Sequence, residues 1–164
     1  LTGLDYSAAA VKLCNQMYGS QENLNYVEGN AMKLPFDDES FDVVYNVESS
    51  HCYSDMGAFI DEAYRVLRPG GYFAWTDFRD EKTMNKIREM FGKTKFEKLK
   101  DTDITQEVIQ ALDEISEQKK SRIEKGTGKI IRRSFETFAG VKGTPVYEAF
   151  VKGDIGYYRC LLRK

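Results

Sequence analysis

The stretch Phe41-Asp42-Val43-Val44-Tyr45-Asn46-Val47 and the later stretch Tyr72-Phe73-Ala74-Trp75-Thr76-Asp77 decide the fold class. The first is apolar on both faces, as expected of a strand buried between helix layers in a parallel sheet, and the second is a strand candidate rich in aromatic residues. Between them, apolar residues at helical spacing predict a helix that Ser54 or Asp55 caps and Arg68-Pro69-Gly70-Gly71 ends. Strand, helix and strand with short connections indicate a right-handed βαβ unit.

The same alternation continues on both sides of this unit. Further strands are predicted at 1–5, 24–28, 95–100 and 155–162. Helices are predicted behind Ser7, around 84–92, around 108–115, and from Thr144-Pro145 to Gly153. The predicted fold class is therefore α/β, with a Rossmann-like, doubly wound, mostly parallel sheet and helices on both faces. We treat residues 1–164 as one domain, with 105–143 as a helical insertion before the last strand.

Composition excludes several classes of protein. The chain has 164 residues, close to the roughly 150 of an average domain, and its net charge of −2 gives no support to nucleic-acid binding. No apolar run approaches the roughly 20 residues of a membrane span, and no signal peptide is evident, so we expect a cytoplasmic protein without stable membrane insertion. Three widely spaced cysteines indicate neither a disulfide framework nor a metal site.

Ligands of open α/β sheets bind at the carboxyl ends of strands, which draws attention to the polar residues there. Asp5 ends the first predicted strand, and its carboxylate is suited to accept hydrogen bonds from the two vicinal hydroxyls of a ribose. The alternative is that Asp5 only caps the helix that follows.

Four motifs in order carry a resemblance to a known family. They are Thr2-Gly3-Leu4-Asp5-Tyr6-Ser7, Gly29-Asn30-Ala31-Met32-Lys33-Leu34-Pro35-Phe36, Phe41-Asp42-Val43-Val44, and Glu62-Ala63-Tyr64-Arg65-Val66-Leu67-Arg68-Pro69-Gly70-Gly71. Their order and spacing resemble the class I S-adenosylmethionine-dependent methyltransferases over roughly the first half of the chain. That family places a first strand and a Gly-x-Gly-x-Gly loop just before this point, so the resemblance implies that the sequence lacks both.

A narrower resemblance extends into the second half of the chain. It rests on the stretches 46–53, 72–79, 103–105 and 138–143. These stretches are similar to the small-molecule O-methyltransferases that include the phthiotriolone/phenolphthiocerol dimycocerosate methyltransferases. That group acts on hydroxyls of polyketide-like lipids and related natural products.

The resemblance implies S-adenosyl-L-methionine as the cofactor and assigns residues to it. Asp5 is expected to bind the ribose hydroxyls, with Tyr6 beside the adenine. Asn30 stands where the family usually has Asp to accept from the adenine amino group, and Ala31 is expected to give its backbone N–H to the ring. Asn46 is expected to meet the methionine end of the cofactor.

The acceptor side needs a group that removes a proton. His51 is the only histidine in the chain and follows the central strand, and imidazole titrates near about 6.5, so His51 is the predicted general base. Glu48 is the second candidate, either as base or as the partner that orients His51. Tyr53 is expected to line the acceptor pocket or to pack in the core. Asp77 and Arg79 are interpreted as an ion pair, with a substrate contact as the alternative.

The predicted insertion supplies the remaining pocket candidates. Phe135 and Phe138, with Leu112 and Ile115, are expected to line an apolar acceptor pocket or to pack against the sheet.

The sequence therefore predicts methyl transfer from S-adenosylmethionine to a hydroxyl of a small, hydrophobic, lipid or polyketide-like molecule. N-methylation of a small amine stays open as an alternative, and so does a truncated or non-catalytic chain with the same fold. A dinucleotide oxidoreductase is a weaker alternative. The oligomeric state is not predicted.

Overall fold

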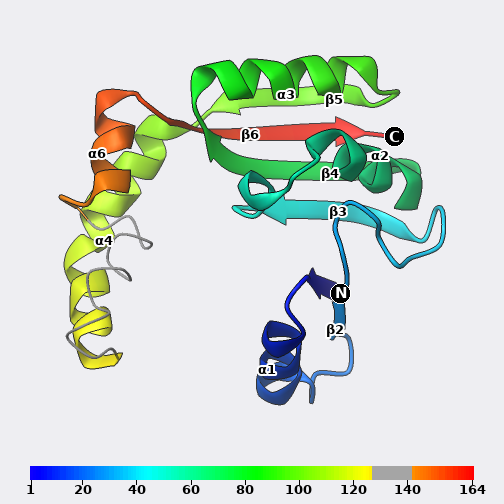
Figure 1. Cartoon of the computed structure of the whole chain (residues 1–164), viewed down its shortest axis with the longest axis horizontal. Helices are drawn as coiled ribbons and strands as arrows, with labels where there is room; N and C mark the ends of the chain where they lie inside the picture. The colour runs from blue at the N-terminus through cyan, green and yellow to red at the C-terminus, as the bar shows by residue number, and fades with distance from the viewer. Residues whose placement is uncertain (127–141) are drawn as a thin grey trace.

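A computed structural model describes residues 1–126 and 142–164 of the chain (Figure 1). Strands and helices alternate through most of it, as the sequence predicts. In chain order the elements are β1 (Thr2–Asp5), α1 (Ala8–Tyr18), β2 (Asn25–Glu28), β3 (Phe41–Val47), η1 (Ser50–Cys52), α2 (Met56–Val66), β4 (Leu67–Arg79), α3 (Glu81–Lys93), β5 (Glu97–Asp103), α4 (Thr105–Gly126), α6 (Pro145–Lys152) and β6 (Gly156–Arg163).

The strands of the described residues form two sheets. Strands β1 and β2 pair in parallel, and β3, β4, β6 and β5 form a second sheet in that order. Strand β3 is parallel to β4, whereas β6 is antiparallel to both β4 and β5. The α/β class and the mostly parallel direction are confirmed, with β6 reversed between its neighbours.

The core lies between one face of the four-stranded sheet and the helices α2 and α3. Alternate residues of β4 point to this face, and Phe73 and Trp75 are almost fully buried there. They meet apolar side chains of both helices, which are Phe59, Ile60 and Ala63 of α2 and Met84, Ile87 and Phe91 of α3. The apolar residues of both helices belong to one core cluster, which explains their helical spacing.

Local signals fix where the helices begin and end. The side chains of Ser7 and Asp55 accept hydrogen bonds from the third residue after each, as N-caps do, and Thr144 precedes α6 with Pro145 in its first turn. Gly153 ends α6 in the left-handed conformation. After α2 the chain enters β4 at once, at Leu67.

The prediction that Phe41–Val47 is buried on both faces is wrong. Val44 and Asn46 point toward the core side, but Val43, Tyr45 and Val47 are 53%, 58% and 55% exposed. These exposed side chains face a groove between β3 and β1, because within the described residues β3 pairs only with β4 and β1 pairs only with β2.

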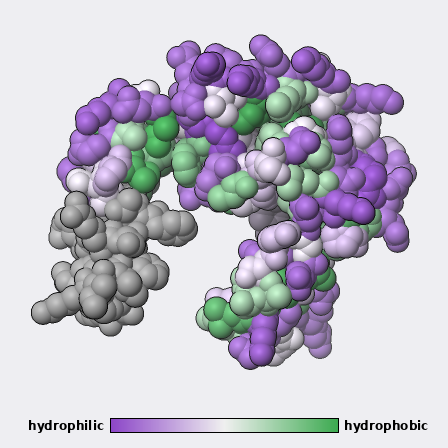
Figure 2. All heavy atoms as spheres, in the orientation of Figure 1, coloured by the Kyte–Doolittle hydropathy of each residue, from purple (hydrophilic) through white to green (hydrophobic). Residues whose placement is uncertain are grey.

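The α1 unit, formed by β1, α1 and β2, lies beyond this groove. Helix α1 has no buried residue, and Leu13 and Met17 are more than half exposed. Figure 2 shows hydrophobic surface on this unit. No helix in the ranges 1–126 and 142–164 is long and apolar enough to cross a bilayer.

Candidate active site

The carboxyl ends of β1 and β2 bring Asp5 and Asn30 to one edge of the small sheet. The backbone N–H of Gly29 donates to the carbonyl of Asp5 over 3.0 Å, so the loop after β2 starts directly beside the end of β1. A side chain at Gly29 would meet Leu4 at 2.8 Å and Pro35 at 3.1 Å. The absence of a side chain at Gly29 therefore lets the loop 29–36 lie this close to β1 without displacing Leu4 and Pro35.

Asp5 combines a local structural contact with exposure to solvent. One carboxylate oxygen, Oδ1, accepts from the backbone N–H of Ser7 over 2.7 Å, and the residue is exposed. Tyr6, beside it, is also exposed. Ser7 is the N-cap of α1, so Asp5 does not cap the helix itself but binds the cap residue, and its carboxylate is still accessible to a ligand at the end of β1.

Asn30 and Ala31 form a tight turn at the end of β2. The side-chain oxygen of Asn30 accepts from the backbone N–H of Met32 over 2.9 Å, and its carbonyl accepts from Lys33. An amide oxygen has two lone pairs, so this contact leaves one for a ligand. Ala31 is buried and lines the groove between β1 and β3.

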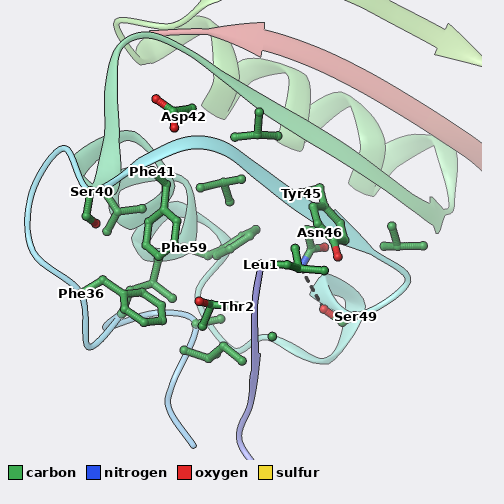
Figure 3. A pocket seen from close by; sticks show the side chains of 18 of the residues that line it. Leu1, Thr2, Phe36, Ser40, Phe41, Asp42, Tyr45, Asn46, Ser49 and Phe59 are labelled. Atoms are coloured by element: carbon green, nitrogen blue, oxygen red, sulfur yellow. Dashed lines mark hydrogen bonds between the residues drawn. The ribbon is translucent and has the colours of Figure 1, made fainter. Parts of the chain in front are cut away.

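Asn46 lies near the end of β3, on the wall of the same groove (Figure 3). Its amide nitrogen donates to Ser49 Oγ over 2.8 Å and to the Tyr53 hydroxyl over 2.9 Å. These two hydroxyls lie 2.7 Å apart and hydrogen-bond each other. These two hydrogen bonds fix the orientation of the Asn46 side chain through its nitrogen.

Oδ1 of Asn46 is a buried acceptor without a hydrogen-bond partner in the described part of the chain. The residue is only 8% exposed. A buried, unsatisfied acceptor costs about 1–3 kcal/mol, so it indicates a ligand donor or an ordered water at this place.

The groove has a volume of about 510 Å³. Its two walls come from β1 and β3, and its base comes from side chains of the loop 31–36 and of α2, including Phe36 and Phe59. In Figure 3 Leu1 and Thr2 face Tyr45 and Asn46 across it. Ala31 and Asn46 both line it, so it joins the ends of β2 and β3.

His51 lies in the short helix η1 that follows β3, just outside this groove. Its ring nitrogen Nδ1 is 2.9 Å from Oδ1 of Asp77, near the end of β4, and its backbone N–H donates to Oδ2 of the same carboxylate over 3.0 Å. The Asp77 side chain is fully buried, whereas that of His51 is 30% exposed. The ring of Phe78 lies 4.6 Å from the imidazole, tilted by 34°.

Further donors surround the buried Asp77 carboxylate. Ser50 Oγ donates to it over 2.8 Å, and the Arg79 guanidinium forms an ion pair with it at 3.1 Å. Arg79 and the Trp75 indole also donate to Ser50 Oγ, both over 2.8 Å. The predicted ion pair between Asp77 and Arg79 is confirmed, and Asp77 has the additional contact with His51.

Glu48 lies on the other side of the β3 end and contacts Tyr157 of β6. Its carboxylate accepts from the Tyr157 hydroxyl over 2.5 Å, and its backbone is in the left-handed region at a φ of 46°. Burial, and then the Glu48 carboxylate, raise the pKa of Tyr157, so this phenol stays a donor. The carboxylate that contacts the His51 ring is therefore that of Asp77, whereas Glu48 contacts Tyr157.

Tyr53 is half-buried and packs edge-on against Phe59 at 5.0 Å between ring centroids, while its hydroxyl holds Asn46. Tyr53 therefore packs against the core and also lines the groove. The predicted pocket residues Phe135 and Phe138 lie outside the described residues.

Sequence reasoning did not select Phe78 and Tyr157 as site residues. Both reach the site because Phe78 and Tyr157 are paired in the antiparallel register of β4 and β6. An all-parallel reading of the sequence places the start of the last strand at the opposite end of the sheet. The contact of Asp77 with His51 could have been suspected, since both follow neighbouring strand ends.

The residues present fit S-adenosylmethionine. The cofactor carries donors on its methionine end, hydroxyls on its ribose and an apolar adenine, and the site offers a buried free acceptor at Asn46, an exposed carboxylate at Asp5 and apolar groove walls. The fit rests above all on Asn46 Oδ1, because this acceptor has no donor among the described residues and the ammonium group of the methionine end would supply one.

Comparisons with known proteins agree with this geometry. Residues 1–75 match the family described as a methyltransferase domain. The fold is similar to that of a Haemonchus contortus phosphoethanolamine N-methyltransferase solved with S-adenosylhomocysteine, with a TM-score of 0.78 and 17% identity over 99% of this chain and 42% of that one. The family match and the curated relatives support a class I S-adenosylmethionine-dependent methyltransferase domain, and the fold agrees with it.

Within this class the chain is similar to lipid-modifying methyltransferases. It is 36% identical over 156 residues to the phthiotriol/phenolphthiotriol dimycocerosates methyltransferase of Mycobacterium tuberculosis, covering 95% of this chain and 57% of the relative. It is 37% identical over 112 residues to a fatty-acid O-methyltransferase of Mycolicibacterium smegmatis, covering 68% of this chain and 40% of that protein. The chain thus spans 57% of the length of the first of these curated relatives, and its match covers less than half of the second.

Proposed function

We propose that this protein transfers a methyl group from S-adenosylmethionine to a hydroxyl of a small hydrophobic molecule, lipid or polyketide-like, with His51 as the general base. The observation that carries the proposal is the placement of a partly exposed imidazole, in contact with Asp77, directly beyond the strand whose Asn46 has an acceptor atom without a partner. The similarity to two relatives, a dimycocerosates methyltransferase and a fatty-acid O-methyltransferase, supports a lipid acceptor.

The chemistry required of the protein is modest. When bound, S-adenosylmethionine supplies an activated methyl group, whose bond to sulfur breaks with the electron pair remaining on sulfur as the acceptor oxygen forms its bond to carbon. His51 takes the hydroxyl proton at Nε2 and later releases it to solvent. Asp5 and Asn46 hold the donor, and such positioning accounts for much of the rate of a two-substrate reaction.

We place the acceptor beside Phe78, whose ring lies 4.6 Å from the His51 imidazole between ring centroids. Phe78 and Phe150 lie 6.2 Å apart there, and Phe150 lies 6.2 Å from Tyr157. Phe150 and Tyr157 are buried, so the partly exposed ring of Phe78 is what offers apolar surface beside the base, and this favours a hydrophobic acceptor over a charged amine.

His51→Ala tests the proposal. We expect turnover of a hydroxylated lipid acceptor to fall by at least about 10²-fold, because general-base help is lost, while cofactor affinity stays nearly unchanged. Transfer of labelled methyl groups to pools of alcohols and of amines measures the acceptor class. Unaltered turnover removes His51 from the mechanism, and labelling of amines alone overturns the hydroxyl acceptor.

A further inference from the structure

We infer that Glu48 is a second binding point for the acceptor: its carboxylate accepts a hydrogen bond from a hydroxyl other than the one that is methylated, so that the site selects diols over simple alcohols. The inference rests on the proposed function for the group that is methylated, but the binding of a diol can be measured without methyl transfer. It starts from the hydrogen bond of 2.5 Å that the Tyr157 hydroxyl donates to Oε1 of Glu48.

The described part of the chain uses one of the two carboxylate oxygens of Glu48. Oε1 binds Tyr157, whereas Oε2 has no hydrogen-bond partner among the described residues, and Glu48 is exposed. An ionised carboxylate only accepts hydrogen bonds, so a ligand at Oε2 must bring a donor. In an acceptor that is an alcohol, this donor is a second hydroxyl.

Tyr157 is the positioning residue for this carboxylate. The residue is buried, its backbone N–H donates to Thr105 Oγ1 over 2.8 Å, and its carbonyl accepts from the backbone N–H of Ile104 over 2.8 Å. Burial first, and then Glu48, raise the pKa of Tyr157, so its hydroxyl remains a donor to Oε1. The carboxylate is thus oriented before a ligand arrives, whereas a glutamate without such a contact keeps its rotamer freedom.

The backbone of Glu48 is held as well. Glu48 at a φ of 46° and Glu39 at a φ of 52° are the non-glycine residues with positive φ in the ranges 1–126 and 142–164. The Glu48 N–H donates to the carbonyl of Thr76 over 3.0 Å, and its side chain extends across β4 to β6. Non-glycine residues in this conformation concentrate at functional sites, where the surrounding structure keeps them in place.

The Glu48 carboxylate and the His51 imidazole lie beside neighbouring rings. Phe78, whose ring is 4.6 Å from the imidazole, is the direct partner of Tyr157 in the register of β4 and β6. Side chains of directly paired residues project from the same face of a sheet, with Cβ atoms about 4.5–5.5 Å apart. The rings of Phe78 and Tyr157 each lie 6.2 Å from that of Phe150. One small molecule can therefore place one hydroxyl at His51 and another at Glu48.

The test is the binding of octan-1-ol, octane-1,2-diol and octane-1,3-diol to the full product of the gene with S-adenosylhomocysteine present, measured by NMR titration. We expect the wild-type protein to bind at least one diol at least about tenfold more tightly than octan-1-ol, because a hydrogen bond to a charged acceptor is gained.

Two substitutions separate the carboxylate from its support. In Glu48→Gln we expect the diol preference to fall to within about twofold, since the amide has a single oxygen, which Tyr157 occupies, and no charge. Tyr157→Phe keeps the carboxylate but removes the hydroxyl that orients it, so the preference should fall there too. Both variants should bind octan-1-ol as the wild type does, which a general loss of structure would not allow.

Glu39→Gln is the matched control, because Glu39 is also an exposed glutamate at positive φ but lies before β3, at the opposite end of the strand. It should keep the wild-type preference. Equal affinity of the wild-type protein for the three alcohols, or a diol preference that Glu48→Gln retains, overturns the inference. A diol preference that depends on Glu48, in a protein that methylates none of the three alcohols, supports the second binding point and overturns the proposed function instead.

Discussion

At the scale of single residues, the site is built from polar groups that hold one another and leave one atom free. Asn46 is held through its nitrogen by Ser49 and Tyr53, which leaves Oδ1 unpaired. His51 is held through Nδ1 by Asp77, which leaves Nε2. In both cases the network fixes the side chain before a ligand arrives, so little conformational entropy is lost on binding.

The three free cysteines provide a residue-scale prediction. Burial raises the pKa of the Cys160 thiol to about 12, whereas Cys52 is exposed. Because the thiolate is the reactive form, we expect iodoacetamide at pH 8 to modify Cys52 readily in the folded protein and to spare Cys160. Mass spectrometry of the labelled peptides measures this, with the protein in urea as the control in which both react.

The same shift has a defined sign for stability. A cysteine in the unfolded chain has a pKa of about 8.5, whereas the pKa of Cys160 in the folded protein is raised to about 12. This contribution is therefore fully present below about pH 8.5 and is lost as the pH rises toward 12. Equal labelling of Cys160 and Cys52 in the folded protein would contradict the burial.

Individual residues of the site could be predicted from their places at strand ends, but their contacts could not. Asp5 and Asn46 lie at the ends of strands that the sequence marks clearly, and His51 follows one of them. The contact between His51 and Asp77 joins residues 26 positions apart in different elements, and an acid at that place is equally compatible with a simple ion pair. Only the register of β3 on β4 decides which side chains meet.

At the scale of elements, the loop after β2 is fixed to α2 by a cluster of charged groups. Arg65 donates to the carbonyls of Leu34 and Phe36 and to the carboxylates of Glu62 and Asp38. Glu62 in turn accepts from the backbone N–H of Leu34 over 2.6 Å. Arg65 holds the pKa of the Glu62 carboxyl below its usual value, so this part of the stability is lost as the pH falls through that pKa.

Arg65→Met tests the importance of this cluster. The methionine keeps the apolar stem but leaves two loop carbonyls and Glu62 without their donor, so we expect the free energy of unfolding to fall by about 2–3 kcal/mol. Urea unfolding measures the change. Arg68→Met is the control, because Arg68 forms a single exposed pair with Asp42, and its loss should cost no more than about 0.5 kcal/mol. Equal effects of the two substitutions would show that the loop is not held by Arg65.

The ends of the helices could be predicted from nearby residues, but the direction and burial of the strands could not. Ser7, Asp55, Thr144 and Gly153 mark helix ends through hydrogen bonds or backbone conformations that involve only nearby residues. The direction of β6 and the exposure of one face of β3 depend on which strands lie beside them. A strand that is apolar on both faces is predicted as buried, whether or not a neighbour covers both of its sides.

At the scale of the whole molecule, the described chain is divided by the groove between β1 and β3. On one side α2 and α3 cover the four-stranded sheet with a large aromatic core, and on the other the α1 unit buries little. The groove walls expose Val43 and Tyr45 beside two strand edges that the described residues leave open. The expected cofactor residues come from both sides, with Asp5 and Asn30 on one and Asn46 on the other, so cofactor binding should join the two parts.

The central claim is that these two sides together bind S-adenosylmethionine, and calorimetric titration of S-adenosylhomocysteine into the full product of the gene tests it most directly. We expect saturable binding of one molecule per chain, with affinity at least about tenfold weaker in Asp5→Ala, because charged hydrogen bonds to the ribose are lost. Asp61→Ala, which removes an exposed acid on α2, should bind as the wild type does. Absence of saturable binding, or equal affinity of Asp5→Ala and Asp61→Ala, would contradict the account.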